Sequence, residues 1–233
     1  MKDYEHQFIK VYCANCGDLV RVMMSCGDRL CEACAKRRMG VLINKYKRNF
    51  QSVRAEDLKW GDLTMVNCDD LEAGYKRLKE CSKKFFADPR IAPHIRSKII
   101  TYQATNKGRG WHVHLHYLAD MDYIPQEIMS KIWLEITGDS FIVSIAHVRD
   151  AESTFAYLVG YACKAQDVLP SASEEYNRVF KGRRLLEVSG KWRGDWTIER
   201  DPFECTKCGG VLWVSEFQLD GLCFHGAHLC CSP

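Results

Sequence analysis

The chain has 233 residues, 46% of them hydrophobic and 11% aromatic, so its composition predicts a packed core and argues against intrinsic disorder. No apolar run reaches the ~18 residues of a membrane span, and the N-terminus lacks a signal-peptide core, which together predict a cytoplasmic protein. The net charge is only +3, but residues 1–55 carry 11 Lys or Arg and 5 Asp or Glu. This excess favours contact with phosphates, with a solvated charged surface as the alternative.

Two C-x-x-C pairs, Cys13/Cys16 and Cys31/Cys34, stand 14 residues apart near the N-terminus. Four thiolates at this spacing can surround one Zn²⁺ ion, with Cys26 as a spare thiol or an alternative ligand. Paired C-x-x-C motifs without a signal peptide favour zinc over disulfides. A basic helix is expected over 35–50, so residues 1–55 are predicted to form a zinc-binding module followed by that helix.

The pattern of residues 56–170 predicts a core domain with a regular order of strands and helices. Alternation and turn residues indicate strands at 62–67, 97–105, 111–119 and 140–148, and helical periodicity indicates helices at 69–86, 125–138 and 151–166. The order β-α-β-β-α-β, followed by a helix, is that of the split βαβ or ferredoxin-like arrangement. The expected fold class is therefore α+β, with an antiparallel sheet backed by helices.

The last part, residues 171–233, is basic and glycine-punctuated over 180–194 and then rich in cysteine and histidine. Cys205 and Cys208 form a third C-x-x-C pair and predict a second zinc ribbon. The other ligands of this ribbon stay open, because five candidates crowd into nine residues: Cys223, His225, His228, Cys230 and Cys231.

Three of the eight histidines, His112, His114 and His116, alternate with Val113 and Leu115. Side chains along a strand change face with period two, so the histidines share one face and the apolar pair the other. Parallel imidazoles at i and i+2 can hold one metal ion. The alternatives are a polar, solvent-facing strand, or a metallohydrolase whose three histidines activate water.

Tyr157, Tyr161 and Lys164 occupy positions i, i+4 and i+7, so they form one stripe of the expected last helix. A tyrosine hydroxyl has an unperturbed pKa near ~10 and needs activation as a nucleophile, which a nearby Lys⁺ favours. A histidine-bound metal can polarise a phosphate. The combination predicts phosphodiester transfer to tyrosine, although a stripe of core tyrosines is the simpler alternative.

Three motifs of the sequence resemble those of a known family. The segment GWHVHLHYL resembles the histidine–hydrophobic–histidine motif of HUH endonucleases, in particular the rolling-circle replication initiators (Rep proteins) of plasmids and phages. The segment DLTMVN resembles the first motif of that family, and YACK resembles its Y-x-x-K motif. The resemblance covers about residues 60–170, and CGDRLCEAC is similar to the cysteine-rich segment that precedes the catalytic domain in some members.

This resemblance implies a ferredoxin-like HUH fold and a nickase that uses Mg²⁺ or Mn²⁺. His114 and His116 match the metal-binding pair, Tyr161 matches the nucleophile and Lys164 its cation. The family reaction leaves a covalent 5′-phosphotyrosine link and a free 3′-OH that primes synthesis. Zn²⁺ would be structural.

Three further residues are assigned less directly by the resemblance. His112 is an extra histidine and a possible DNA contact. Gln103 matches the third metal ligand by position, but its strand register is open: opposite Val113 it faces away, and opposite His112 or His114 it joins the metal. Tyr157 would be the second tyrosine of a two-tyrosine enzyme, but Gly160 stands where that type commonly has Lys.

The implied partner is origin DNA, single-stranded or in a hairpin. The chain has no G-x-x-x-x-G-K-[ST] motif, so a host helicase and a host polymerase are expected, with no small-molecule cofactor and no membrane. Trp111, Trp192 and Trp196 are either stacking platforms for bases or ordinary core residues. The rival functions are a transposase or relaxase of the same superfamily and a non-catalytic, zinc-dependent DNA-binding protein.

Overall fold

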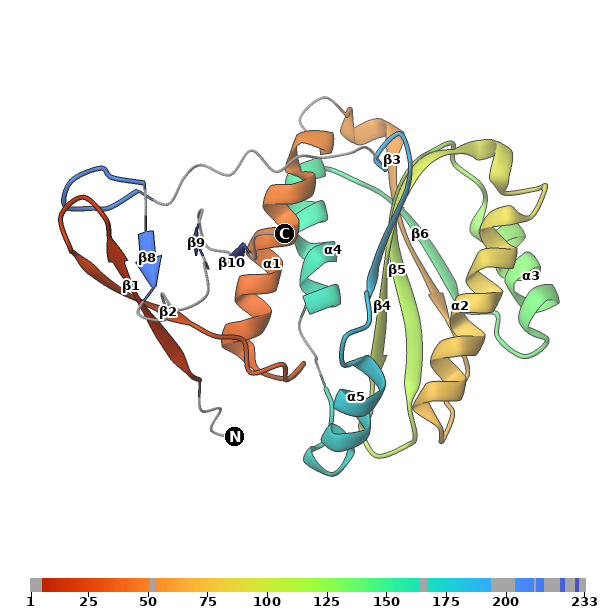
Figure 1. Ribbon diagram of the computed structural model, residues 1–233. Coiled ribbons are helices and arrows are strands. Elements are labelled where there is room, and N and C mark those ends of the chain that lie inside the picture. Colours follow the sequence, from red (N-terminus) through yellow and green to blue (C-terminus); the bar gives the residue numbers. More distant parts are fainter. Residues whose placement is uncertain are drawn as a thin grey trace. The chain divides into compact units, whose positions relative to one another are not determined.

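The computed structural model describes residues 6–50, 53–163, 167–193, 204–211, 213–215, 223–224 and 229–230 (Figure 1). The chain divides into two compact units, one of Met1–Gly27 with Thr197–Pro233 and the other of Asp28–Trp196. This division differs from the three consecutive parts expected at 1–55, 56–170 and 171–233. The basic helix belongs to the larger unit, and the C-terminal cysteine segment belongs with the N-terminal strands.

The smaller unit is built on a sheet with the strand order β10-β9-β8-β1-β2. Its strands are β1 (Phe8–Cys13), β2 (Leu19–Met23), β8 (Trp213–Ser215), β9 (Cys223–Phe224) and β10 (Leu229–Cys230), and each neighbouring pair is antiparallel. Alternation along β1 buries Val11 and Cys13, which pack with Trp213 and Cys205. Among the described residues of this unit, the core is small.

The larger unit contains a sheet with the strand order β6-β3-β5-β4-β7. Its strands are β3 (Leu58–Thr64), β4 (Ile95–Thr105), β5 (His112–Met121), β6 (Val143–His147) and β7 (Leu186–Gly190). Every neighbouring pair is antiparallel, which confirms the predicted α+β class with an antiparallel sheet. Strand β7 was not expected, because its alternating run of Leu186–Gly190 has only five residues and lies in a segment interpreted as a basic, glycine-punctuated extension.

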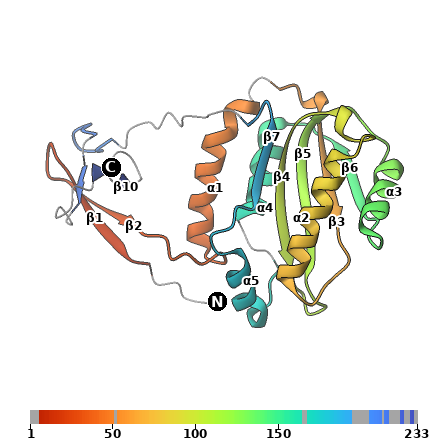
Figure 2. The ribbon, with the colours of Figure 1, turned by 45° about the vertical axis from the view of Figure 1, so that its right-hand side comes forward.

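Helices cover both faces of this sheet (Figures 1 and 2). α2 (Leu71–Ala87) and α3 (Gln126–Thr137) lie on one face, and α4 (Ala151–Cys163) lies on the other with α1 (Glu32–Tyr46) packed against it. The remaining helices are α5 (Ser173–Phe180) and short 3-10 turns at Lys47–Phe50, Ala55–Asp57, Ala92–His94 and Pro170–Ala172. The predicted order of helices and strands over 62–163 is therefore confirmed, within a few residues at each end.

Local signals explain where these helices start and stop. The side chain of Asp70 caps α2 by accepting a hydrogen bond from the Ala73 amide at 3.0 Å. α3 follows Pro125 and ends at Gly138, whose φ of 81° lies in the left-handed region that favours glycine. The sequence predicts both ends of this helix because both signals are local.

Strand β3 begins four residues earlier than the sequence predicted, at Leu58 instead of Asp62. The reason is a tertiary contact at Gly61, where a Cβ atom would lie 2.2 Å from the phenol of Tyr117. A glycine in this run weakens the alternation that marks a strand, but it lets the tyrosine ring of β5 lie against the β3 backbone.

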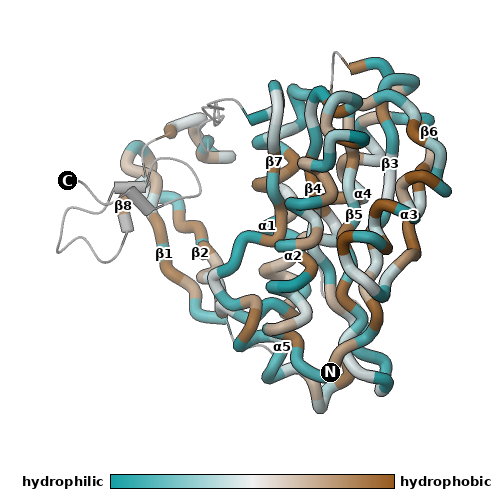
Figure 3. Tube along the Cα trace, turned by 90° about the vertical axis from the view of Figure 1, so that its right-hand side faces the viewer, coloured by the Kyte–Doolittle hydropathy of each residue, from teal (hydrophilic) through white to brown (hydrophobic). Residues whose placement is uncertain are grey.

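Hydrophobic residues from the sheet and the helices form the main core of the larger unit. Figure 3 colours the trace by residue hydropathy. Trp111 and Trp192 are buried in this core, so they are core residues and not exposed platforms for bases; Trp196 lies outside the described residues. Within the part of the chain that the structure describes, no helix has the length and apolarity needed to cross a bilayer.

Candidate active site on the sheet face beneath α4

Strand β5 places the three histidines on one face of the sheet, as the alternation predicted. Val113 and Leu115 are buried on the opposite face. On the neighbouring strands, Asp62 of β3 pairs in register with His116, and Gln103 of β4 pairs with His114. The register therefore answers the question that the sequence left open about Gln103, whose side chain lies on the histidine face.

Three ligand atoms converge at the centre of this face. Oε1 of Gln103 lies 2.8 Å from Nε2 of His114 and 3.0 Å from Nε2 of His116. Gln103 and His116 are buried. Burial, together with the neighbouring His116 and His112, lowers the pKa of His114 to about 4, so this imidazole is neutral at pH 7. A neutral imidazole is the form that binds a metal ion.

Asp62 fixes the orientation of His116. Nδ1 of His116 donates a hydrogen bond to Asp62 Oδ1, and the hydroxyl of Ser144 donates to Oδ2 at 2.6 Å. Burial alone would raise the pKa of Asp62, but the hydrogen bonds from His116 and Ser144 outweigh it and lower the pKa. The carboxylate therefore stays ionised.

This hydrogen bond decides which nitrogen of His116 is free. With the proton on Nδ1, Nε2 carries a lone pair, and it approaches the carbonyl oxygen of Gln103, which is also an acceptor. Two acceptors at this distance suit a cation beside them. Hydrogen bonding of the second ring nitrogen to a carboxylate is the usual arrangement around metal-binding histidines. The donor set thus fits a metal ion held by His114, His116 and Gln103.

His112 lies at the edge of this group. Its Nδ1 is 2.9 Å from Oδ1 of Asn67, and its ring centroid is 5.0 Å from that of His114. Burial lowers the pKa of His112. The described contacts of His112 are thus with Asn67 and His114, while Gln103 contacts the other two histidines.

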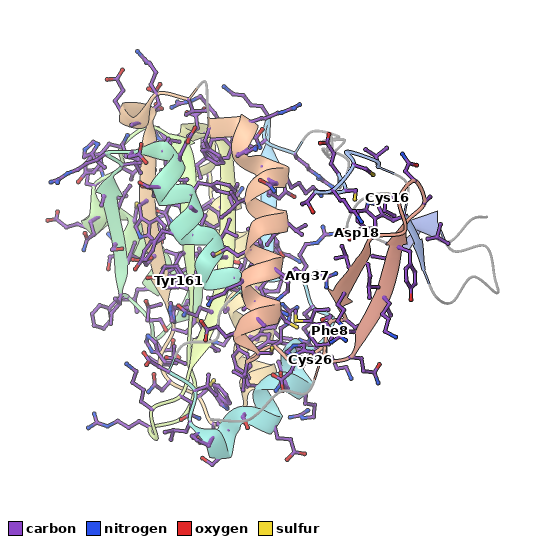
Figure 4. The ribbon with its side chains drawn as sticks, turned by 90° about the vertical axis from the view of Figure 1, so that its left-hand side faces the viewer. Phe8, Cys16, Asp18, Cys26, Arg37 and Tyr161 are labelled. Carbon is purple, nitrogen blue, oxygen red and sulfur yellow. The ribbon has the colours of Figure 1, made fainter. Side chains whose placement is uncertain are left out.

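Helix α4 brings two tyrosines to the same face. Figure 4 labels Tyr161 on this helix. The ring of Tyr161 stacks on His116, with ring centroids 3.9 Å apart and an interplanar angle of 26°. The hydroxyl groups of Tyr157 and Tyr161 are hydrogen-bonded to each other, and Tyr157 is 61% exposed. Burial and the hydrogen bond to Tyr157 both raise the pKa of Tyr161, so its hydroxyl is protonated at neutral pH.

Two functional neighbours were not singled out from the sequence. Asp62 stands inside the DLTMVN segment, and Trp60 precedes it by two residues on the same strand face. The Trp60 ring lies 5.5 Å from His116, 5.8 Å from Tyr157 and 6.2 Å from Tyr161, between centroids, and so packs against the site. Only the period-two pattern of β3 could have pointed to them. Lys164, the predicted cation, lies outside the described residues.

The cysteines are grouped differently from the sequence prediction. The sulfur atoms of four of them lie within 4.8 Å of one another: Cys13, Cys16, Cys205 and Cys208. Cys31 and Cys34 instead belong to the larger unit, at the start of α1, where the Cys31 sulfur accepts a hydrogen bond from the Cys34 amide. The partner of the Cys13/Cys16 pair is thus the third C-x-x-C pair, because β1 pairs with β8.

The other predicted zinc ligands near the C-terminus are five residues in and around two short strands. Cys223 and Cys230 lie in the short strands β9 and β10, and the structure describes only their backbone. His225, His228 and Cys231 lie outside the described residues.

No family model and no curated protein matches the sequence. Among solved structures, the N-terminal nuclease domain of non-structural protein 1 of minute virus of mice is 12% identical, with 79% of this chain and 66% of that chain covered and a TM-score of 0.19. That structure is described as having a unique Zn²⁺ coordination in its active-site pocket and a novel mode of DNA recognition at the origin of replication. A TM-score this low does not establish a shared fold.

Proposed function

We propose that the larger unit is a metal-dependent DNA nickase and strand transferase of the HUH endonuclease type, which initiates rolling-circle replication of a plasmid or phage. One observation carries the proposal: the Tyr161 ring stacks on His116 beside the converging atoms of His114, His116 and Gln103. A nucleophile candidate and a metal-binding candidate thus share one sheet face.

The sheet topology supports the HUH assignment. Strands β6, β3, β5 and β4 stand side by side in that order, with α2 and α3 on one face and α4 on the other. This is the order expected of a split βαβ domain. It brings together the three sequence motifs, which contribute Asp62, the histidines of β5 and Tyr161.

His114, His116 and Gln103 would hold the metal ion, with Asp62 and Ser144 orienting His116 from behind. A divalent ion there supplies Lewis acidity toward a phosphate oxygen. We assign it as Mg²⁺ or Mn²⁺, in line with the reaction of the family that the motifs resemble.

The tyrosine hydroxyl then attacks one phosphodiester of a single DNA strand. A bond forms between the Tyr161 oxygen and phosphorus, and the bond from phosphorus to the 3′ oxygen breaks. The phenolic proton leaves to water, directly or through the hydrogen-bonded Tyr157 hydroxyl, and the 3′ oxygen takes a proton from water. The products are a 5′-phosphotyrosine and a free 3′-OH, which a host polymerase extends.

A basic groove on the α2 side of the sheet, the face opposite Tyr161, offers a second surface for DNA contacts. The groove has a volume of about 670 Å³, and five of its lining residues are cations: Lys76, Lys79, Arg183, Arg184 and Arg193. Glu187 pairs with Lys79 and Glu72 with Arg183, so the groove keeps an excess of positive charge. Such a surface suits sequence-independent contacts with phosphates.

The test uses the full chain, Mn²⁺ and single-stranded oligonucleotides that tile the DNA flanking its own gene. Each oligonucleotide is labelled at its 5′ or 3′ end. The expected product is an adduct that survives denaturation and retains the 3′-end label, with release of a 5′-labelled fragment that a polymerase extends. Tyr161→Phe should abolish the adduct, whereas Tyr123→Phe, at an exposed tyrosine outside the site, should not.

Other outcomes redirect or reject the proposal. An adduct that survives Tyr161→Phe but is lost in Tyr157→Phe reassigns the nucleophile. Cleavage without an adduct, unaffected by Tyr161→Phe, indicates a water-activating metallohydrolase. Salt-sensitive DNA binding without cleavage on any of these oligonucleotides indicates a non-catalytic DNA-binding protein. Transfer between two transposon ends, in place of priming, would indicate a transposase.

A further inference from the structure

Two turns of the smaller unit have the same sequence pattern and the same conformation. Cys13-Ala14-Asn15-Cys16-Gly17 follows β1, and Cys205-Thr206-Lys207-Cys208-Gly209 precedes β8. In each turn the glycine amide donates to the carbonyl of the first cysteine at 2.8 Å. Gly17 and Gly209 have φ values of 70° and 71°, in the left-handed region that favours glycine. Each turn therefore presents two thiols on one side.

Strand pairing brings these two turns together. Strand β1 pairs antiparallel with β8, with Cys13 opposite Trp213 in the register. The sulfur of Cys13 lies 3.5 Å from that of Cys208, and the sulfur of Cys16 lies 3.6 Å from that of Cys205, 189 residues away. Each close pair thus joins one thiol from each turn.

The sulfur geometry matches a tetrahedral zinc site. A disulfide requires sulfur atoms about 2.05 Å apart, so these contacts are not disulfides, and the cysteines are free. Zinc–thiolate bonds of about 2.3 Å place the ligands of a tetrahedral site about 3.8 Å apart. The closest pairs at 3.5 and 3.6 Å, with all four sulfurs within 4.8 Å, fit this geometry.

The packing around the turns supports a stabilising role for a metal in this unit. Among the residues of this unit that the structure describes, the buried core comprises Val11, Cys13, Cys205 and Trp213, with Ile9, Val20 and Val22 partly buried against it. A core of this size stabilises a fold only weakly, and small domains of this kind commonly gain their stability from a structural metal.

We propose that one structural Zn²⁺ ion is bound by all four thiolates of these two turns: Cys13, Cys16, Cys205 and Cys208. Four protein ligands leave no open position, so the ion is structural and takes no part in the DNA chemistry proposed above. The site joins the beginning and the end of the chain, and strands β1, β2 and β8 fold as one zinc ribbon. This inference does not depend on the function of the larger unit.

The test measures the zinc content of full-length variants and subtracts it from that of the unmodified protein. Zinc bound at any other site then cancels in the difference. Cys16→Ser and Cys208→Ser should each remove one equivalent, and the double variant should also remove only one, because both residues serve the same ion. Cys81→Ser, at a buried cysteine of α2, should remove none. Co²⁺ loaded into the zinc-depleted chain should show tetrahedral thiolate absorption that Cys208→Ser weakens.

A conservative variant guards against simple misfolding. Cys208→His keeps a zinc-binding side chain and should retain the equivalent with a changed cobalt spectrum. The proposal is overturned if Cys208→Ser keeps all of its zinc, or if the double variant loses two equivalents. The second outcome would place the Cys16 and Cys208 pairs in separate sites, as the sequence alone suggested.

Discussion

Asp62 lies opposite His116 in the register of β3 and β5, and its carboxylate accepts the hydrogen bond from Nδ1 of that ring. This contact leaves Nε2 of His116 facing Gln103, on the side where Tyr161 stacks. The orientation of the proposed metal ligand therefore depends on a residue that would not itself bind the metal.

The first prediction concerns Asp62 as a positioning residue. Asp62→Asn removes the charge that holds the proton on Nδ1, so the metal concentration giving half-maximal adduct formation should rise by about 10- to 100-fold. Ser144→Ala should shift it in the same direction by less. Asp122→Asn, at an exposed carboxylate paired with Arg96, is the matched control. A reduced rate at saturating metal with an unchanged metal requirement would contradict this role.

The second prediction concerns the pH dependence of Tyr161. The hydrogen bond that the Tyr161 hydroxyl donates to Tyr157 contributes to the raised pKa of Tyr161, so Tyr157→Phe should lower that pKa. The rate of first-strand nicking, measured against pH, should then rise at lower pH than in the unmodified protein. A titration of tyrosine absorbance provides an independent readout. An alkaline shift of the profile would show that Tyr157 assists deprotonation instead.

The third prediction concerns stability in acid. The pKa of His114 is about 4 in the folded state, against an ordinary value of 6.5. The unfolded chain therefore binds the extra proton first as the pH falls, and the folded state should lose stability between about pH 6.5 and 4, by up to about 3 kcal/mol for this group. Urea unfolding without added divalent metal measures the effect. His114→Gln should flatten this slope, and an equal slope in both proteins would refute the assignment.

The fourth prediction concerns the metal. Two imidazoles and one amide oxygen form a softer donor set than the all-oxygen sites that Mg²⁺ prefers, so Mn²⁺ should support adduct formation at lower concentration than Mg²⁺. Gln103→Glu adds a hard carboxylate and should narrow the difference between the two ions, whereas Gln103→Ala should weaken both. Equal Mn²⁺ and Mg²⁺ requirements in the unmodified protein would argue against this ligand set.

The fifth prediction concerns the basic groove. Arg184→Glu and Arg193→Glu should each weaken binding of single-stranded DNA at low salt and reduce the slope of log affinity against log salt by about 1. Arg54→Glu, at an exposed arginine paired with Asp57 outside the groove, serves as the control. If the control variant loses as much DNA affinity as the two groove variants, the loss comes from the change in net charge and not from this groove.

Much of the larger unit could be predicted because its signals are local. Hydrophobic periodicity, the cap at Asp70 and the glycine after α3 depend on neighbours within a few residues, so they are visible in the sequence. Strand β7 and the early start of β3 were missed. Both depend on partners far along the chain, with β7 pairing to β4 and Gly61 lying against Tyr117.

The sequence by itself determined that His112, His114 and His116 share one face of a strand, since side-chain alternation is a property of the extended backbone. It likewise identified Cys13/Cys16 and Cys205/Cys208 as C-x-x-C pairs suited to zinc. Only the tertiary structure decided that Gln103 and Asp62 stand beside the histidines, because a shift of one residue in strand register would turn either side chain to the opposite face. Only the pairing of β1 with β8 decided which cysteines meet, because a C-x-x-C pattern carries no information about its partner.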